Sequence, residues 1–195
     1  MGGRVTAVKP VVELAVGEYL SGLAAATPVP GGGSAAALAG AMGSGLLCMV
    51  TRIAMRKAKD APAQESLRWL EIEFERCLEN LGVLSQEDID AYDAVVLARK
   101  EAGKESRRFA DCVAEATRVP LDTADAADRA LRIADRLRPL ALPVTVSDFE
   151  TGCYLLETAF KGGMANAAIN LPDLHPDHRE QFQQRYDALS KKRSK

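Results

Sequence analysis

Apolar residues recur at steps of three and four along almost the whole chain, and this spacing constrains the fold more than any other feature. Alanine is abundant, and no stretch alternates apolar with polar residues as a half-buried strand does. A period near 3.6 residues places the apolar side chains on one face of a helix, where other helices can cover them. The sequence therefore predicts an all-α protein.

Proline and glycine residues divide the chain into expected helices. These lie near residues 10–26, 34–59, 64–82, 85–101, 104–118, 121–138, 147–171 and 176–192. Pro120 is expected to separate two of them, because proline cannot donate the backbone hydrogen bond of a helix interior. The 195 residues suffice for one buried core, and no long linker interrupts them. We expect residues 10–195 to form a single-domain antiparallel helical bundle after a flexible leader, residues 1–9.

Composition excludes several classes of function. The 25 basic and 27 acidic residues leave a net charge of −2, so we expect no general attraction to nucleic acid. The four cysteines are scattered without a CxxC pair, which indicates reduced core thiols rather than a metal site. We expect no membrane-spanning segment of about twenty uncharged apolar residues. These features together favour a cytoplasmic protein with no metal and no membrane partner.

A glycine-rich segment leads directly into an alanine-rich helix. Pro30 precedes Gly31, Gly32 and Gly33, and Ser34 follows them. Free backbone N–H groups at a helix start favour an anion or the polar edge of a ligand. The lysine and hydroxyl residue of a Walker motif are missing, so a nucleoside triphosphate is not expected. The alternative is a tight turn in which Ser34 caps the helix.

The expected helix 34–59 has a narrow face of small residues that ends at Lys57. Residues such as Gly40 and Gly43 allow another backbone to approach this face closely. Lys57 can meet a buried carboxylate or a substrate anion at the end of the face. Alternatively, it only complements the partial negative charge of the helix C-terminus.

A carboxylate occupies an apolar position near the middle of the chain. Apolar residues recur from Leu67 to Leu84, and the same angular phase continues to Asp88 and Tyr92. If one helix continues through this region, burial raises the pKa of Asp88 toward the range useful for proton transfer. The alternative is that a new helix begins at Ser85 and that Asp88 belongs to its acidic first turn.

The expected helix 147–171 carries polar residues at both ends of an apolar face. Ser147 and Glu150 have the spacing of a capping box. Asp148 lies at one end of the face, and Asn166 and Asn170 lie at the other. The two amides can bond each other or nearby backbone, or they can bind the polar edge of a heterocycle.

These segments occur in one order along most of the chain. They are the glycine segment from Thr27 to Ala37, then Asp88–Tyr92, Val119–Leu121, Ser147–Asp148 and Asn166–Asn170. In this order and spacing, the chain from about residue 12 to residue 171 resembles the cyclodeaminase/cyclohydrolase family of folate enzymes. The resemblance implies an all-α homodimer that acts on a tetrahydrofolate derivative and holds no permanently bound cofactor.

The resemblance also implies roles for the residues singled out above. Asp88 would transfer a proton at the one-carbon unit, with Lys57 nearby. The expected substrate-binding residues are Pro30, Gly31, Gly32, Gly33, Ser34, Tyr92, Ser147, Asp148, Asn166 and Asn170. Arg52, Arg56, Lys57 or Lys161 would steer the anionic glutamate tail of folate.

The expected activity is hydrolysis of the methenyl bridge of methenyltetrahydrofolate to formyltetrahydrofolate. The alternatives are a formimidoyltetrahydrofolate cyclodeaminase that releases ammonia, and a helical dimer that binds folate without catalysis or is purely structural. A further alternative is an anion-binding module that uses the glycine turn for phosphate.

Overall fold

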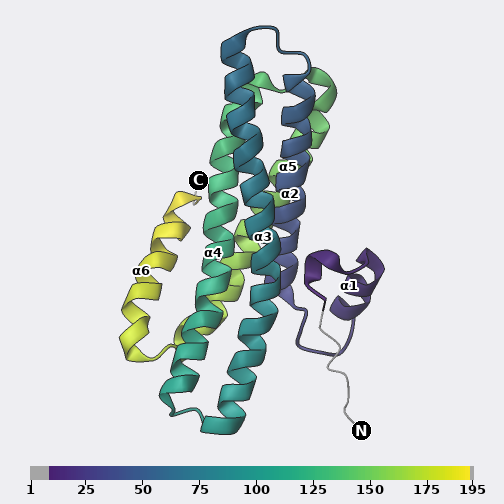
Figure 1. Cartoon of the computed structure of the whole chain (residues 1–195). Helices are drawn as coiled ribbons and strands as arrows, with labels where there is room; N and C mark the ends of the chain where they lie inside the picture. The colour runs from purple at the N-terminus through teal and green to yellow at the C-terminus, as the bar shows by residue number, and fades with distance from the viewer. Residues whose placement is uncertain (1–8, 194–195) are drawn as a thin grey trace.

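Four helices form the body of the protein in the computed structural model, which describes residues 9–193 (Figure 1). They are α2 (Gly32–Met55), α3 (Ala61–Ala102), α4 (Arg107–Leu137) and α5 (Val146–Asn170). Helix α2 packs against α3 and α5, and α4 packs against the same two helices from the other side. The described residues contain no strand, so the predicted all-α bundle is confirmed.

Shorter elements complete the chain. They are η1 (Val11–Glu13), α1 (Val16–Leu23), η2 (Arg138–Leu140), η3 (Pro143–Thr145), η4 (Leu171–Asp173) and α6 (Pro176–Lys192). Helix α6 packs against α4, and α1 lies beside the start of α2 (Figure 1). Val11 is buried, and its N–H donates to Oε1 of Gln86 at 3.0 Å. The predicted leader, apart from Lys9, lies outside the described residues.

Helix α3 is continuous where the sequence left two alternatives open. Gly82 and Ser85 are both buried inside it, and Asp60 caps its start by accepting the N–H of Ala63 at 2.8 Å. The expected helices 64–82 and 85–101 are therefore one element. Asp88 lies in its interior and is not part of an acidic first turn.

Helix α4 is also continuous, and the predicted boundary at Pro120 is wrong. Pro120 lies in the middle of α4 and is buried. A proline at this position removes the backbone N–H that would bond the carbonyl of Ala116, four residues earlier. The carbonyl instead accepts a hydrogen bond from the side chain of Asn170, at 2.8 Å. A partner from another helix thus offsets part of the cost of the proline.

Helix α2 is apolar on nearly all sides: most of it is buried against α3 and α5, and its outer face carries the exposed side chains of Met42 and Met49. Small residues let its neighbours approach: a Cβ atom on Gly43 would come within 2.6 Å of the carbonyl oxygen of Gly152 in α5. By length and composition α2 could cross a membrane, contrary to the expectation that no such segment exists. Of its most apolar window, 67% is buried inside the protein, which is typical of a core helix.

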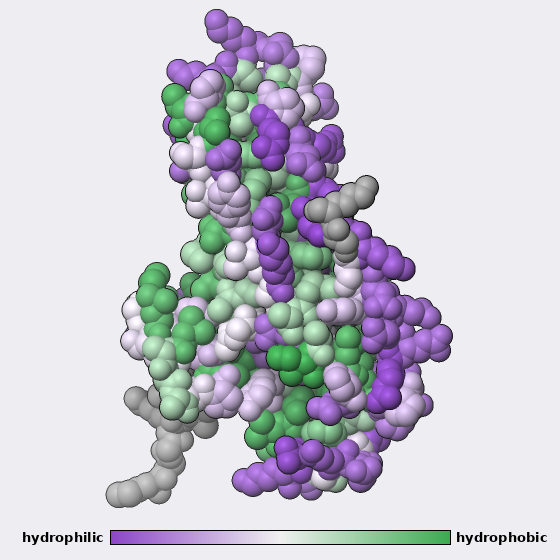
Figure 2. Space-filling model, turned by 180° about the vertical axis from the view of Figure 1, so that it is seen from behind, coloured by the Kyte–Doolittle hydropathy of each residue, from purple (hydrophilic) through white to green (hydrophobic). Residues whose placement is uncertain are grey.

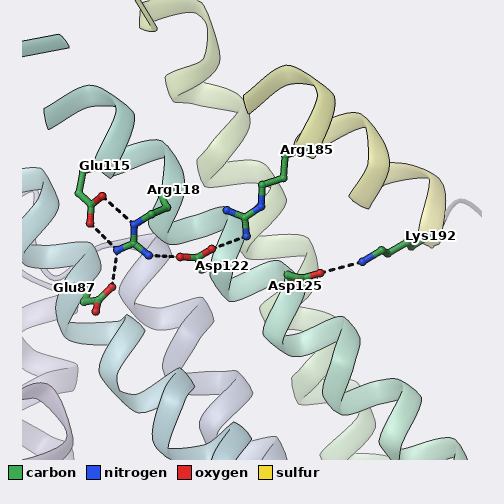
Figure 3. Close-up of polar contacts among 7 residues, drawn as sticks. All are labelled: Glu87, Glu115, Arg118, Asp122, Asp125, Arg185 and Lys192. Carbon is green, nitrogen blue, oxygen red and sulfur yellow. Dashed lines mark hydrogen bonds and ion pairs between the residues drawn. The ribbon is translucent and has the colours of Figure 1, made fainter. Parts of the chain in front are cut away.

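Charged residues connect α3, α4 and α6 on one side of the bundle (Figure 3). Arg118 of α4 pairs with Glu87 of α3 at 2.9 Å and with Asp122 one turn further along α4. Asp122 also pairs with Arg185 of α6. Lys192, near the end of α6, pairs with Asp125 at 2.9 Å. These contacts fix α6 against α4.

The four cysteines are free thiols, as predicted. Cys48, Cys77 and Cys153 are buried, and burial raises the pKa of each of these three thiols. They remain protonated near neutral pH and pack as small apolar side chains.

Candidate active site

A cavity of about 660 Å³ lies at one end of the bundle, where α3 and α4 continue past the start of α2 and the end of α5. Its size falls within the usual range for small-molecule sites, ~300–1,000 Å³. Figure 2, which shows the molecule from behind, has hydrophobic residues gathered in the lower half that contains this end. The walls combine backbone, apolar and charged groups from all four helices.

Asp88 lies at the cavity against the N-terminus of α2. Its Oδ2 atom accepts the backbone N–H of Ser34 at 2.8 Å. Gly33 leaves the space that the carboxylate occupies, because a Cβ atom there would lie 2.0 Å from Oδ1 of Asp88. The glycine segment and Asp88 are therefore in direct contact.

Buried hydroxyl groups hold this helix start in place. The Ser34 hydroxyl lies 3.0 Å from the Tyr19 hydroxyl and 2.9 Å from the Ser85 hydroxyl. Ser85 also donates to the carbonyl oxygen of Ser34 at 3.0 Å. The interpretation of Ser34 as the N-cap is wrong, because Gly31 occupies the cap position and Ser34 bonds α1 and α3. Three segments are thereby fixed behind Asp88.

Burial raises the pKa of the Asp88 carboxyl above its ordinary value near 3.8, and the hydrogen bond from Ser34 only partly opposes this. Removing water disfavours the charged form, whereas an N–H donor favours it. A carboxyl group in this setting can accept a proton and return it at a pH closer to neutrality.

Two amide side chains also line the cavity. Asn166 and Asn170 lie one turn apart at the end of α5, and both line the cavity. Nδ2 of Asn166 donates to the carbonyl of Gly162 at 2.8 Å, and Nδ2 of Asn170 donates to that of Ala116. A Cβ atom on Gly32 would lie 3.3 Å from Nδ2 of Asn166, so the glycine segment and this amide are neighbours.

The structure brings together most of the predicted site residues. Those that line the cavity are Gly31, Gly32, Gly33, Asp88, Tyr92, Asn166 and Asn170. Pro30 packs instead against Gly22 of α1, and Ser34 is fully buried behind the cavity wall. These two residues support the site and do not face its interior.

Lys57, Ser147 and Asp148 do not lie near Asp88 within the subunit. The expectation that Lys57 lies near Asp88 is wrong within the subunit, whereas substrate binding by Ser147 and Asp148 stays a prediction. Lys57 follows the C-terminal end of α2, more than twenty residues from Gly33, which at 1.5 Å per residue is about 35 Å. Ser147 and Asp148 begin α5, at the end opposite Asn166. The predicted capping box is also absent, because Thr145 is the N-cap residue of α5. The apolar face of α5 between Asp148 and Asn166 is packed against α2 and α4 rather than open.

Two cations at the cavity were missed. Arg99 and Lys104 line it, near the turn that joins α3 to α4. The residues proposed to steer an anion, Arg52, Arg56, Lys57 and Lys161, do not line it. Arg99 continues the spacing of Asp88 and Tyr92, so the phase of an unbroken α3 would have indicated it.

A possible set of metal ligands lies elsewhere. Among the described residues, Cys48, Glu71 and Glu75 place one ligand atom each within 4.8 Å of one another. Arg52 pairs with both glutamates and supplies the positive charge between them. None of these residues lines the cavity beside Asp88.

A known protein family matches nearly the whole chain. The sequence profile described as formiminotransferase-cyclodeaminase matches residues 15–188, which include the whole cavity wall. The chain belongs to this family. The matched range includes the glycine segment, Asp88 and the two asparagines.

Two curated relatives of this formiminotransferase-cyclodeaminase family member have different names. The chain is 28% identical over 160 residues to the methenyltetrahydrofolate cyclohydrolase of Methylorubrum extorquens, covering 78% of this chain and 75% of that protein. It is 28% identical over 167 residues to the formimidoyltransferase-cyclodeaminase of Dictyostelium discoideum, covering 85% of this chain. The second match covers 31% of the Dictyostelium protein, so this chain spans about a third of it.

A solved structure shows that the bundle of this family member is shared. The crystal structure of formiminotetrahydrofolate cyclodeaminase from Thermotoga maritima matches with a TM-score of 0.78 at 22% identity. The match covers 93% of this chain and 94% of that chain. The likeness establishes the fold, including the helices whose ends surround the cavity.

Proposed function

We propose that this protein is an enzyme of one-carbon folate metabolism that hydrolyses the methenyl bridge of methenyltetrahydrofolate. The observation that carries the proposal is the position of Asp88, a partly buried carboxyl group held at a ligand-sized cavity by the N-terminus of α2. Membership of the formiminotransferase-cyclodeaminase family supports a folate substrate. The cyclohydrolase of Methylorubrum extorquens supports the hydrolytic reaction, since most of its length matches.

Asp88 would act first as a base and then as an acid. Its carboxylate accepts a proton from water while the water oxygen attacks the cationic methenyl carbon, which forms a tetrahedral carbinol. As the carbon–nitrogen bond breaks, Asp88 returns the proton to the departing ring nitrogen, and the carbinol proton leaves to solvent. The raised pKa of Asp88 makes both transfers feasible near neutral pH. The N–H of Ser34 keeps the carboxylate aimed at one place.

The remaining cavity groups match the two ends of a folate. Asn166 and Asn170 offer polar atoms for the pterin ring, and Gly31 and Gly32 let a flat ring approach the backbone. Arg99 and Lys104 would attract the anionic glutamate tail at the other end of the cavity. Val96 and Phe109, which also line the cavity, offer apolar contacts to the aromatic portion between them.

The alternative activity is that of a formimidoyltetrahydrofolate cyclodeaminase. The name of the Dictyostelium relative supports it at the same 28% identity. The two reactions share a tetrahedral carbon and a proton-transfer group, so the same cavity serves either one. Ammonia released from formimidoyltetrahydrofolate, measured beside loss of methenyltetrahydrofolate absorbance, separates them.

A homodimer is the proposed assembly. Met42 and Met49, on the outer face of α2, are exposed by 53% and 36%. Leu78 of α3 lies beside Gly45 between them and is 39% exposed. A contiguous apolar face of this kind is typical of a subunit contact. Sedimentation should give a dimer, and Met42→Glu should shift it toward a monomer.

Replacing Asp88 with asparagine tests directly whether this carboxyl group transfers the proton. Asp88→Asn keeps an oxygen for the N–H of Ser34, so the fold should survive while turnover of methenyltetrahydrofolate falls by ~10²-fold or more. Asp93→Asn, an exposed change on the same helix, is the matched control and should retain wild-type turnover.

The outcomes separate the alternatives. Wild-type protein that binds folate without turnover above the uncatalysed rate would favour the non-catalytic binder. Phosphate affinity without folate affinity would favour the anion-binding module. Full turnover by the Asp88→Asn variant would remove Asp88 from the mechanism.

A further inference from the structure

Pro120 leaves one carbonyl of α4 without its helical partner. In an α-helix the N–H of each residue bonds the carbonyl four residues earlier, and proline has no N–H to give. The proline ring also crowds that carbonyl and tilts it away from the helix axis. Here the affected carbonyl belongs to Ala116, and both residues line the cavity.

Asn170 takes the place of the missing donor. Its Nδ2 atom lies 2.8 Å from the carbonyl oxygen of Ala116, across 54 residues of sequence. Asn170 is the last residue of α5, so its side chain is held by a neighbouring helix rather than by its own. A cavity residue is therefore anchored by a backbone carbonyl that has lost its helical donor to a proline.

This contact decides which atom of the Asn170 amide remains for a ligand. A carbonyl oxygen only accepts hydrogen bonds, so the nitrogen of the amide must face Ala116 and the oxygen must face elsewhere. The amide of Asn166 is oriented in the same way: its Nδ2 atom donates to the carbonyl of Gly162 at 2.8 Å, so its oxygen also faces elsewhere. Among the described residues, none donates a hydrogen bond to Oδ1 of either asparagine. Two acceptor oxygens thus remain one helical turn apart.

We propose that Pro120 is a positioning residue that makes Asn170 a fixed hydrogen-bond acceptor at the cavity. With Asn166, it selects a ligand edge that carries two N–H donors and rejects an edge that presents carbonyl oxygens. The edge of a reduced pterin that bears the 2-amino group and the neighbouring ring N–H has this pattern. The identity of the ligand rests on the proposed function, whereas the anchoring of Asn170 by Ala116 does not.

A purely structural role for Pro120 makes different predictions. The helices α4 and α5 approach closely here, because a Cβ atom on Gly163 would lie 2.6 Å from the carbonyl oxygen of Pro120. If close packing were the whole role, replacing the proline would change stability and leave the Asn170 amide where it is. If the proline acts through Asn170, its effect on binding must disappear when Asn170 is absent.

The first experiment needs no ligand. In Pro120→Ala, the restored N–H competes for the carbonyl of Ala116, so the side-chain amide protons of Asn170 should exchange with solvent faster by NMR. We expect at least a fivefold increase, which corresponds to the loss of one ordinary hydrogen bond. Pro139→Ala, in η2 just after the C-terminal end of α4, is the control and should leave this exchange unchanged. Unchanged exchange in Pro120→Ala would overturn the proposal.

The second experiment is a double-mutant cycle on the affinity for 5-formyltetrahydrofolate. Pro120→Ala should weaken binding about fivefold in the wild-type background and less than twofold in the Asn170→Ala background. An equal loss in both backgrounds would show that the proline acts by packing, and would overturn the proposal.

An analogue with methyl in place of the 2-amino group tests the donor edge. Wild-type protein should bind the analogue about tenfold more weakly than the parent, and Pro120→Ala should reduce this discrimination. Equal binding of both ligands by the wild type would contradict recognition of that edge. Failure of the wild type to bind any pterin would count against the proposed function, while the exchange experiment would still decide the role of Pro120.

Discussion

A methyl group added to Gly33 tests the contact between α2 and Asp88 directly. In Gly33→Ala the new Cβ atom would lie 2.0 Å from Oδ1, 2.5 Å from Cγ and 2.7 Å from Oδ2 of Asp88. Carbon and oxygen atoms without a bond between them pack above 3 Å, so the carboxylate must retreat by more than ~1 Å. That movement breaks its 2.8 Å hydrogen bond with the N–H of Ser34.

The expected consequence is a large loss of turnover with a moderate loss of stability. A displacement of ~1 Å in a proton-transfer group costs on the order of 10²-fold in rate. Overpacking and the lost hydrogen bond should lower the free energy of unfolding by about 1–3 kcal/mol, part of which the stiffer alanine offsets. At about 2–4 °C per kcal/mol for a protein of this size, Tm should fall by no more than ~12 °C.

Two further glycines provide the controls for this variant. Gly17→Ala, where nothing lies within 4 Å of the new Cβ atom, should leave kcat unchanged. Gly32→Ala places its Cβ atom 3.3 Å from Nδ2 of Asn166 and should raise KM more than it lowers kcat. The assay is loss of methenyltetrahydrofolate absorbance at a temperature where circular dichroism shows each variant folded. A folded Gly33→Ala variant with kcat within threefold of wild type would refute the reasoning.

Three other predictions concern charge. Burial raises the pKa of Asp88, so its protonated form favours the folded state at low pH. As pH rises from below about 3.8 through the raised pKa, the wild type should therefore lose stability relative to Asp88→Asn. Denaturant unfolding at several pH values measures this difference, and a constant difference would contradict it. Arg99→Gln should weaken binding of a folate with its glutamate tail about three- to tenfold and leave a tail-less pteroate unaffected in calorimetry; equal losses for both ligands would argue against a tail contact. Arg185→Gln removes the ion pair with Asp122 and should lower the free energy of unfolding by about 0.5–1 kcal/mol at low salt, an effect that 1 M salt should largely abolish in denaturant titrations.

The helical architecture was predictable because its signal is spread over many residues. Every helix of the bundle repeats its apolar residues with the same period, so single exceptions do not hide the pattern. The break predicted at Pro120 is wrong because the local sequence shows the cost of a proline and not the tertiary contact that offsets it. Asn170, which lies far away in sequence, supplies the hydrogen bond that makes the proline tolerable.

The candidate site was predictable only where local sequence determines position. Asp88 and Tyr92 followed from the phase of a continuous helix, and the glycines followed from their own conformational freedom. Lys57 and Asp148 were misplaced because residue type does not reveal which end of a 24- or 25-residue helix meets the cavity. Antiparallel packing brings the start of α2 to the end of α5, and this relation is set by the whole bundle.

A crystal structure with a bound folate such as 5-formyltetrahydrofolate tests the central claim most directly. The account predicts a pterin ring between the glycine segment and the two asparagines, with its one-carbon unit within about 3–4 Å of the Asp88 carboxylate or one water away. A folate bound instead at the opposite end of the bundle, beside Lys57 and Asp148, would contradict it.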